Sequence, residues 1–235
     1  MIAENIARIR ERIHEAAARA GRDANEITLM AVSKTFPAAA IREAYESGLR
    51  IFGENRVQEF ATKADEARKL SGSHFHLIGH LQSNKAAKAV ELFDAVDSVD
   101  SFRLASKLNP AAKDAAKTLD VLLEINIGSE AAKSGLPPDI NDHDFQQLLR
   151  ELPRFEDLRL RGLMCIPPHT DDPAGARPYF RKMRELRDAI TALKIPNIEM
   201  TTLSMGMSYD FEVAIQEGST CVRLGTAIFG ERPKP

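Results

Sequence analysis

A lysine at the end of an apolar run is the first residue whose position in this sequence suggests chemistry. Residues 27–32, Ile-Thr-Leu-Met-Ala-Val, are rich in strand formers, and Ser33, Lys34 and Pro37 follow closely. This pattern predicts a buried strand that ends in a tight loop, with Lys34 at its carboxyl end. A lysine in this position can extend its ammonium group into water. A partly desolvated lysine can instead act as a Schiff-base amine.

Two glycine-containing loops near the end of the chain offer groups that suit a phosphate. Ser204 and Gly206 follow one strand-like run, and Gly225 and Thr226 follow the next. The two hydroxyls can donate hydrogen bonds, Gly206 would let the backbone approach a ligand, and Gly225 and Thr226 could add backbone N–H donors. Tight turns that need glycine for positive φ would contain the same residues. The sequence leaves both interpretations open.

Arg223 lies inside a strand pattern, between Val222 and Leu224. An arginine that points into a core must find an acceptor, because burying an unpaired charge is costly. The acceptor could be a glutamate on a neighbouring strand, or a group on a cofactor. A Schiff-base lysine, a phosphate site and a buried arginine facing a ring nitrogen together fit pyridoxal 5′-phosphate (PLP).

These residues must be positioned by an alternating series of strands and helices. Isoleucines at helical spacing predict an amphipathic helix over residues 2–20, which Gly21 ends. Strand-like runs then lie near 27–32, 50–53, 74–78, 94–99, 121–127, 159–165, 198–203 and 220–224. Helical patterns occupy 38–48, 55–70, 82–92, 101–117, 141–152, 174–193 and 208–217. This order predicts an α/β fold, a single (β/α)₈ TIM-type barrel with an extra N-terminal helix.

An open, doubly wound sheet is the alternative, because periodicity does not show whether a sheet closes. Such sheets usually carry a glycine fingerprint after the first strand when they bind nucleotides, and none occurs here. Without a linker or repeat, residues 1–235 are predicted to form one domain. In a barrel, the site lies at the carboxyl ends of the strands, where Asn55, His80 and Lys133 are also expected. The sequence assigns no role to His80 or Lys133.

Composition excludes several classes of protein. The 32 basic and 34 acidic residues give a net charge of −2, so no global field favours nucleic acid or anionic membrane. Four basic residues between 181 and 187 have acidic neighbours and predict a solvated helix face. No apolar run is long enough to span a bilayer, and the N-terminus lacks a signal-peptide core. Two cysteines, Cys165 and Cys221, are too few for a disulfide framework. We therefore expect a cytoplasmic protein.

The sequence resembles the YggS/PROSC family of pyridoxal phosphate-binding proteins, whose fold is similar to the barrel of alanine racemase. The resemblance covers nearly the whole chain. It rests on Ala31-Val32-Ser33-Lys34-Thr35, Phe52-Gly53-Glu54-Asn55, Ile78-Gly79-His80-Leu81-Gln82-Ser83-Asn84-Lys85, Gly162-Leu163-Met164, Ile166-Pro167-Pro168, Leu203-Ser204-Met205-Gly206-Met207-Ser208, Gly218-Ser219-Thr220, Val222-Arg223 and Gly225-Thr226-Ala227-Ile228-Phe229-Gly230.

This resemblance implies that Lys34 carries PLP covalently as an internal aldimine. It further implies that Arg223 faces the pyridine nitrogen, that Asn55 lies near the ring, and that Ser204, Gly225 and Thr226 hold the phosphate. The family often has lysine at the position of Phe36 and another residue at Arg56, which puts surface detail in doubt. The implied role is maintenance of PLP supply, and indirectly of amino-acid and keto-acid balance. Apo forms of PLP-dependent enzymes are the candidate acceptors of the cofactor.

A weakly active, racemase-like enzyme is the main alternative to a carrier. An arginine cannot protonate the pyridine nitrogen, so the ring is a weaker electron sink. Racemisation also needs acid/base groups on both faces of the substrate, and Tyr45, Tyr179 and Tyr209 all fall in predicted helices. The chain ends directly after the eighth unit, so we expect no counterpart of the racemase's C-terminal domain. These points favour a carrier without a complete racemase site.

A metal-dependent barrel hydrolase is a more remote alternative. His74, His76 and His80 form H-x-H-x-x-x-H, and residues two apart on a strand face the same way. However, no complementary set of acidic ligands stands out in the sequence. We therefore predict no metal site.

Overall fold

Eight parallel strands close into a barrel in chain order, with β8 pairing back onto β1. The computed structural model describes residues 1–231, so residues 232–235 of the predicted domain lie outside the described part. The predicted (β/α)₈ barrel is confirmed, and the open sheet is not formed. The strands are β1 (Thr28–Val32), β2 (Ile51–Glu54), β3 (His74–Leu77), β4 (Ala95–Val99), β5 (Leu119–Ile125), β6 (Leu158–Cys165), β7 (Ile198–Ser204) and β8 (Cys221–Leu224).

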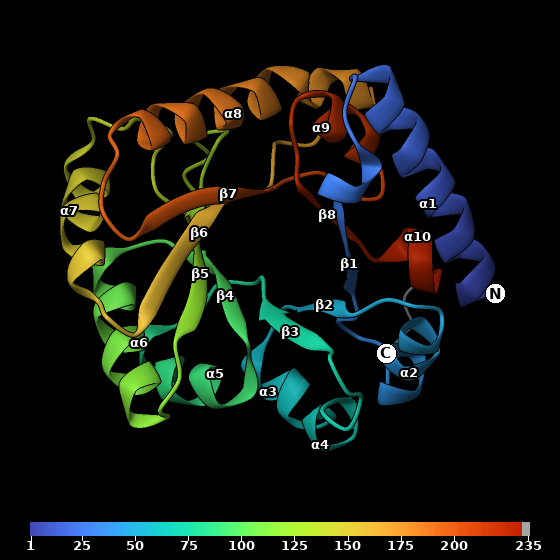
Figure 1. The fold of residues 1–235 in the computed structure, drawn as a ribbon, viewed down its shortest axis with the longest axis horizontal. Helices are drawn as coiled ribbons and strands as arrows, with labels where there is room; N and C mark the ends of the chain where they lie inside the picture. Colours follow the sequence, from blue (N-terminus) through green and yellow to red (C-terminus); the bar gives the residue numbers. More distant parts are fainter. Residues whose placement is uncertain (232–235) are drawn as a thin grey trace.

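Helices surround the barrel on its outside (Figure 1). They are α1 (Ile2–Arg19), α2 (Ala38–Glu46), α3 (Val57–Ala61), α4 (Ala64–Ala67), α5 (Ala86–Leu92), α6 (Phe102–Asp114), α7 (His143–Glu151), α8 (Arg177–Ala192), α9 (Phe211–Gln216) and α10 (Thr226–Phe229). Short 3₁₀ turns are η1 (Ala24–Glu26), η2 (Ser83–Lys85), η3 (Leu152–Arg154) and η4 (Pro173–Ala176). No helix among residues 1–231 is both long and apolar enough to cross a membrane.

The strands bury apolar side chains on both faces, as expected for a parallel sheet. Outward-facing residues pack against the helices, for example Phe52 and Phe75, whose rings stack and extend to Phe60 of α3. Inward-facing residues form a separate cluster inside the barrel, made of Met30, Val32, Ile78, Leu122, Met164 and Cys221. This cluster fills the middle of the barrel, so a ligand would bind at the amino or the carboxyl ends of the strands.

The extra N-terminal helix is present and packs on the helices around the last strand of the barrel, mainly α9 and α10. Its buried stripe is Ile2, Ile6, Ile9 and Ile13, as the spacing predicts. The stripe packs against α9 and α10, beside which α1 lies in Figure 1. Gly21 adopts φ of +65° directly after the helix, and this left-handed conformation ends it.

The structure differs from the prediction in two helical segments that border the site. The helix expected over 55–70 is divided into α3 and α4, because Lys63 leaves the helical conformation and turns its side chain inward. The helix expected from 208 begins only at Phe211, after a turn over Met207–Asp210. In addition, α10 forms directly after β8, where the sequence predicted only a loop.

Candidate functional site

A pocket of about 250 Å³ lies at the carboxyl ends of the strands. Of the residues predicted for the site, Lys34, Asn55, Arg223, Gly225 and Thr226 all line it. The remaining lining residues are Val32, Phe36, Ile78, Ile166, Met207, Ser208 and Tyr209. A second cavity, of about 230 Å³, lies at the amino ends of the strands and contains none of these polar groups. The carboxyl-end pocket is therefore the candidate site.

A buried ion pair between Lys63 and Glu54 supports the turn that carries Lys34. Lys63 Nζ lies 2.8 Å from Glu54 Oε1, and Ser33 Oγ donates to the same oxygen at 2.6 Å. Lys63 also donates to the carbonyls of Ser33 and Phe36, at 2.9 and 3.0 Å. Because these carbonyls flank Lys34, the ion pair fixes the backbone of its turn. Burial raises the pKa of Glu54, although Lys63 opposes this shift.

Arg223 is only 3% exposed, and its guanidinium bonds to neutral oxygens. Nη1 donates to the carbonyl and to the hydroxyl of Ser204, at 2.7 and 2.8 Å. Nη2 donates to the carbonyl of Cys165 on β6, at 2.7 Å. These acceptors lie on β7, which neighbours β8, and on β6, one strand further round the barrel, so the side chain is fixed across the barrel mouth. The glutamate salt bridge that the sequence left open is not formed among the described residues.

Ser204 and Gly206 lie behind the pocket wall. Ser204 is fully buried against Arg223, which gives its hydroxyl a supporting position. Gly206 adopts φ of +95°, and a Cβ atom there would come within 2.6 Å of Ala214 on α9. This glycine therefore permits close packing against a helix, whereas the sequence suggested close approach to a ligand. The predicted direct contacts of these two residues with a ligand find no support in this geometry.

Ser208 and Tyr209 line the pocket and were missed by the sequence reasoning. The hydroxyl of Ser208 accepts from the amide of Ala227, at 3.3 Å, which places it beside Gly225 and Thr226. Tyr209 was predicted in a helix, but it lies in the turn before α9 and donates to the carbonyl of Asp171. The second serine of the Ser-Met-Gly-Met-Ser run was the available signal for Ser208.

Two further contacts shape the wall near Lys34. Asn55 follows β2, and a Cβ atom at Gly79 would approach the Asn55 carbonyl to 2.2 Å, so this position requires glycine. Phe36 stacks on Phe229 of α10, with ring centroids 4.9 Å apart. Phe36 therefore lines the pocket, whereas we expected the departure from the family pattern at this position to affect surface detail.

Glu124 on β5 is an inward-facing carboxyl that the sequence reasoning did not single out. Its strand neighbour Leu122 belongs to the interior cluster, so the carboxyl lies one layer above this cluster. Its Oε2 is buried and has no hydrogen-bond partner among residues 1–231. Burial and the nearby charge of Asp100 raise the pKa of Glu124 to about 7, while His80 and Arg223 oppose this shift.

The histidines of the H-x-H-x-x-x-H run do not converge on a metal site. His76 Nδ1 bonds to Asp97 at 3.0 Å inside the barrel, and His80 Nδ1 lies 3.2 Å from Asp100 at its mouth. Within residues 1–231, no group of three or more histidine, cysteine, aspartate or glutamate side chains could hold a metal ion. The geometry gives no support to a metal-dependent hydrolase.

The pocket lining combines three kinds of polar group: an amine, a guanidinium and two hydroxyls. It includes the primary amine of Lys34 and the guanidinium of Arg223. The hydroxyls of Ser208 and Thr226 lie with Gly225 at the start of α10. Between them the wall is largely apolar, which suits a flat ring. An aldehyde, a ring nitrogen and a phosphate would therefore each meet a suitable group.

Known proteins resemble this chain over nearly its whole length. The sequence matches the family model of the alanine racemase N-terminal domain over residues 4–233. The pyridoxal phosphate homeostasis protein of Aquifex aeolicus is 44% identical over 229 residues, covering 97% of each chain. The protein of the same name from Pseudomonas aeruginosa is 46% identical over 231 residues, covering 98% of this chain and 96% of its own.

Solved structures show the same barrel. PipY of Synechococcus elongatus without PLP matches with a TM-score of 0.86 and 39% identity, covering 98% of this chain and 100% of PipY. PipY with PLP bound matches with a TM-score of 0.83 and 38% identity over the same shares. An alanine racemase of Clostridium difficile matches in fold alone, with a TM-score of 0.71, 16% identity and 57% of its chain covered by 99% of this one. This chain therefore belongs to the alanine racemase N-terminal domain family, within its group of pyridoxal phosphate homeostasis proteins.

Proposed function

We propose that this protein binds PLP at the carboxyl end of its barrel and serves intracellular PLP homeostasis as a reversible store. The single observation that carries this proposal is that Lys34, Arg223 and the Ser208–Gly225–Thr226 group line one pocket. Relatives named as pyridoxal phosphate homeostasis proteins, and the existence of PipY both with and without PLP, support it.

Covalent attachment through Lys34 accounts for both tight holding and release. Lys34 would supply the amine that condenses with the aldehyde of PLP, with release of one water and formation of a carbon–nitrogen double bond. Hydrolysis would return the lysine amine and the free aldehyde, whereas exchange with an incoming primary amine would return the lysine amine and release the cofactor as the imine of that amine. Asn55 lines the same pocket as Lys34 and would contact the ring.

The phosphate would be held by the hydroxyls of Ser208 and Thr226 and by the backbone at Gly225. Ser204 would not contact the phosphate itself; its hydroxyl would orient Arg223 through a hydrogen bond. Arg223 donates hydrogen bonds and does not give up its proton, so a ring nitrogen beside it stays unprotonated. This favours storage over carbanion chemistry, because the ring is then a weaker electron sink.

Titration with PLP tests the proposal directly. The wild-type protein should develop a visible absorption band, and Lys34→Ala should bind without that band and roughly tenfold or more weakly. Thr226→Val should keep the band but raise the dissociation constant by about tenfold, as expected for a lost hydrogen bond to a charged group. Lys69→Ala, which removes an exposed lysine from outside the pocket, is the matched control. An unchanged band in Lys34→Ala would refute attachment at this residue.

Delivery to an acceptor is a separate part of the proposal. PLP-loaded protein is mixed with the apo form of a PLP-dependent enzyme, and recovery of that enzyme's activity is followed over time. Directed delivery predicts recovery faster than the release of PLP into buffer containing a trapping amine. Equal rates would show that the protein acts as a passive store.

A racemase-like side activity is the second candidate, because Tyr209 places a phenol at the pocket. A phenol near the substrate could exchange a proton that Lys34 alone would not reach. Exchange of the α-hydrogen of alanine for deuterium would be followed in heavy water. Activity lost in Tyr209→Phe would support this candidate, and the absence of exchange in the wild-type protein would exclude it.

A further inference from the structure

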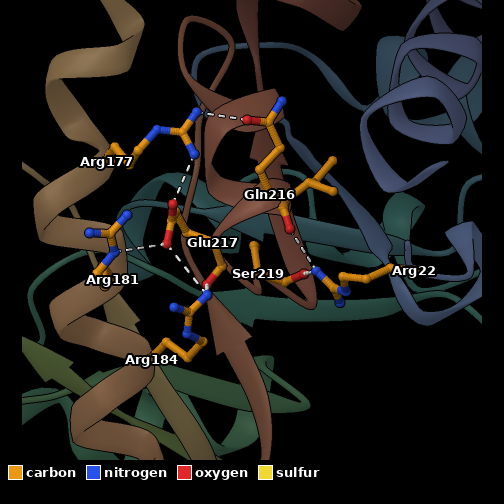
Figure 2. Close-up of polar contacts among 8 residues, drawn as sticks. Arg22, Arg177, Arg181, Arg184, Gln216, Glu217 and Ser219 are labelled. Carbon is orange, nitrogen blue, oxygen red and sulfur yellow. Dashed lines mark hydrogen bonds and ion pairs between the residues drawn. The ribbon is translucent and has the colours of Figure 1, made fainter. Parts of the chain in front are cut away.

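A buried carboxylate outside the pocket lining forms ion pairs with three arginines. Glu217 directly follows α9 and is only 5% exposed. Arg177, Arg181 and Arg184 of α8 approach its oxygens to 2.8, 3.5 and 3.4 Å (Figure 2). Arg177 also donates to the side chain of Gln216, at 2.7 Å. One buried negative charge thus ties α9 to α8. The helix face that the sequence predicted as solvated is partly engaged in this contact.

A second set of bonds holds the same end of α9 from the opposite side. Arg22 donates to the carbonyls of Ile215 and Ser219, both at 2.8 Å, and Figure 2 shows it approaching from the side away from α8. The hydroxyl of Ser219 lies within 3.2 Å of the carbonyls of Leu203, Met205 and Cys221. The C-terminal end of α9 is therefore fixed to α8, to the segment before β1 and to β8.

The other end of α9 carries one side of the pocket. Residues 205–210, named here the β7–α9 loop, contain Met207, Ser208 and Tyr209 of the pocket wall. Asp210 accepts from the amide of Met207 at 2.7 Å, which closes the loop into a tight turn. Gly206 packs against Ala214 so closely that a Cβ atom would clash. This close packing couples the position of the loop to that of α9, because a displacement of the helix would press on the loop or open a void beside it.

We propose that Glu217 is a positioning residue that, through α9, places the β7–α9 loop for the phosphate of the ligand and so sets the preference for phosphorylated over phosphate-free aldehydes. This inference rests on the proposed PLP site. A carboxylate is needed because a neutral side chain would leave three clustered guanidinium groups to repel one another. The bonds from Arg177 and Arg181 outweigh the effect of burial and lower the pKa of Glu217, so it is ionised at neutral pH.

The test compares Glu217→Gln with Glu185→Gln, an exposed residue on α8 that serves as the charge-matched control. Dissociation constants are measured for PLP and for pyridoxal with the wild-type protein and both variants. Pyridoxal partly cyclises in solution, but this equilibrium is common to all three proteins and cancels from the ratios. We expect Glu217→Gln to raise the PLP constant about tenfold and the pyridoxal constant less than about twofold, as for a small displacement of a binding group. The control should change neither.

An equal change for both ligands, or no change for either, would overturn the inference, because a merely structural role does not distinguish the phosphate. If Glu217→Gln does not fold, Arg177→Gln replaces it; that variant removes one partly exposed guanidinium and should lower the preference for PLP in the same direction. The proposed site fails separately: a wild-type protein without preference for PLP over pyridoxal would refute the phosphate subsite itself.

Discussion

At Arg223, the barrel buries a permanent positive charge, and within the described part of the chain its hydrogen-bond acceptors are neutral oxygens. Ser204 and Cys165 supply three acceptors, so the guanidinium is oriented while its charge is left uncancelled by any bonded carboxylate. Such an arrangement is costly for stability alone and is typical of a group kept for a ligand. Glu124, on the next strand beyond Cys165, is the nearby acid whose pKa responds to this charge.

Glu124→Gln should stabilise the protein at high pH. The folded pKa of about 7 lies above the ordinary value of 4.5, so the folded state holds a proton that the unfolded state releases. The free energy of unfolding therefore falls as pH rises between these values, by about 3 kcal/mol at most. Glutamine mimics the protonated acid and removes this penalty. Urea unfolding at pH 5 and pH 8 measures the effect, and a variant no more stable than wild type at pH 8 would contradict it.

Lys63→Met should destabilise the protein by about 3–5 kcal/mol, because it leaves the buried carboxylate of Glu54 unpaired. It should also weaken PLP binding, since Lys63 holds the carbonyls on either side of Lys34. Lys69→Met, on the same segment but exposed, should change neither quantity. Thermal unfolding and PLP titration check both expectations. Loss of stability without loss of affinity would show that the turn is held by other contacts.

Single residues could be predicted where a polar group directly follows a strand, as for Lys34, Asn55, Gly225 and Thr226. Lys63 could not be identified, because its pattern is that of an ordinary helix residue and its inward turn depends on Glu54. Ser204 and Ser208 belong to one short run, and the sequence alone does not show which of the two lines the pocket. In the structure Ser204 is bonded to Arg223, and Ser208 is the serine that lines the pocket.

At the scale of elements, the strands matched their predicted positions closely, because apolar runs of strand length are a strong signal between helices. Helix boundaries were less predictable. The start of α9 depends on Asp210 bonding back to Met207, and the break after α3 depends on Lys63. Both are tertiary effects that periodicity does not record.

Gly206→Ala tests how strictly α9 positions its loop. The positive φ and the 2.6 Å approach to Ala214 predict a loss of about 1–3 kcal/mol together with weaker PLP binding. Gly21→Ala shares a positive φ but meets nothing within 4 Å, so it should cost about 1 kcal/mol and leave binding intact. Chemical denaturation and PLP titration of both variants measure the difference. Equal effects of the two substitutions on affinity would argue against rigid coupling of α9 and the loop.

At the scale of the whole molecule, one layer of apolar side chains separates a cavity at each end of the barrel. The cavity at the amino ends of the strands is lined by His76 and Asp97, whose Nδ1 and Oδ1 atoms lie 3.0 Å apart. Burial lowers the pKa of His76, but Asp97 outweighs this and raises it overall. The pair therefore stabilises the fold fully below about pH 6.5, the ordinary value, and less as pH rises through the folded pKa.

His76→Gln should make the free energy of unfolding depend less on pH. We expect a loss of about 1–3 kcal/mol at pH 6 and a progressively smaller loss as the pH rises through the raised pKa of folded His76. The exposed His14, replaced in the same way, is the control. Urea unfolding across this range measures the effect. A loss that grows with pH would reverse the assigned sign and refute the charged pair.

The most direct test of the central proposal is borohydride reduction of the PLP-loaded protein, followed by peptide mass mapping. Reduction converts the carbon–nitrogen double bond into a stable secondary amine, so the attached residue is recorded permanently. We predict loss of the visible absorption band and a single phosphopyridoxyl adduct on the peptide that contains Lys34. An adduct at another lysine, or none at all, would contradict the assignment of Lys34 as the residue that holds PLP.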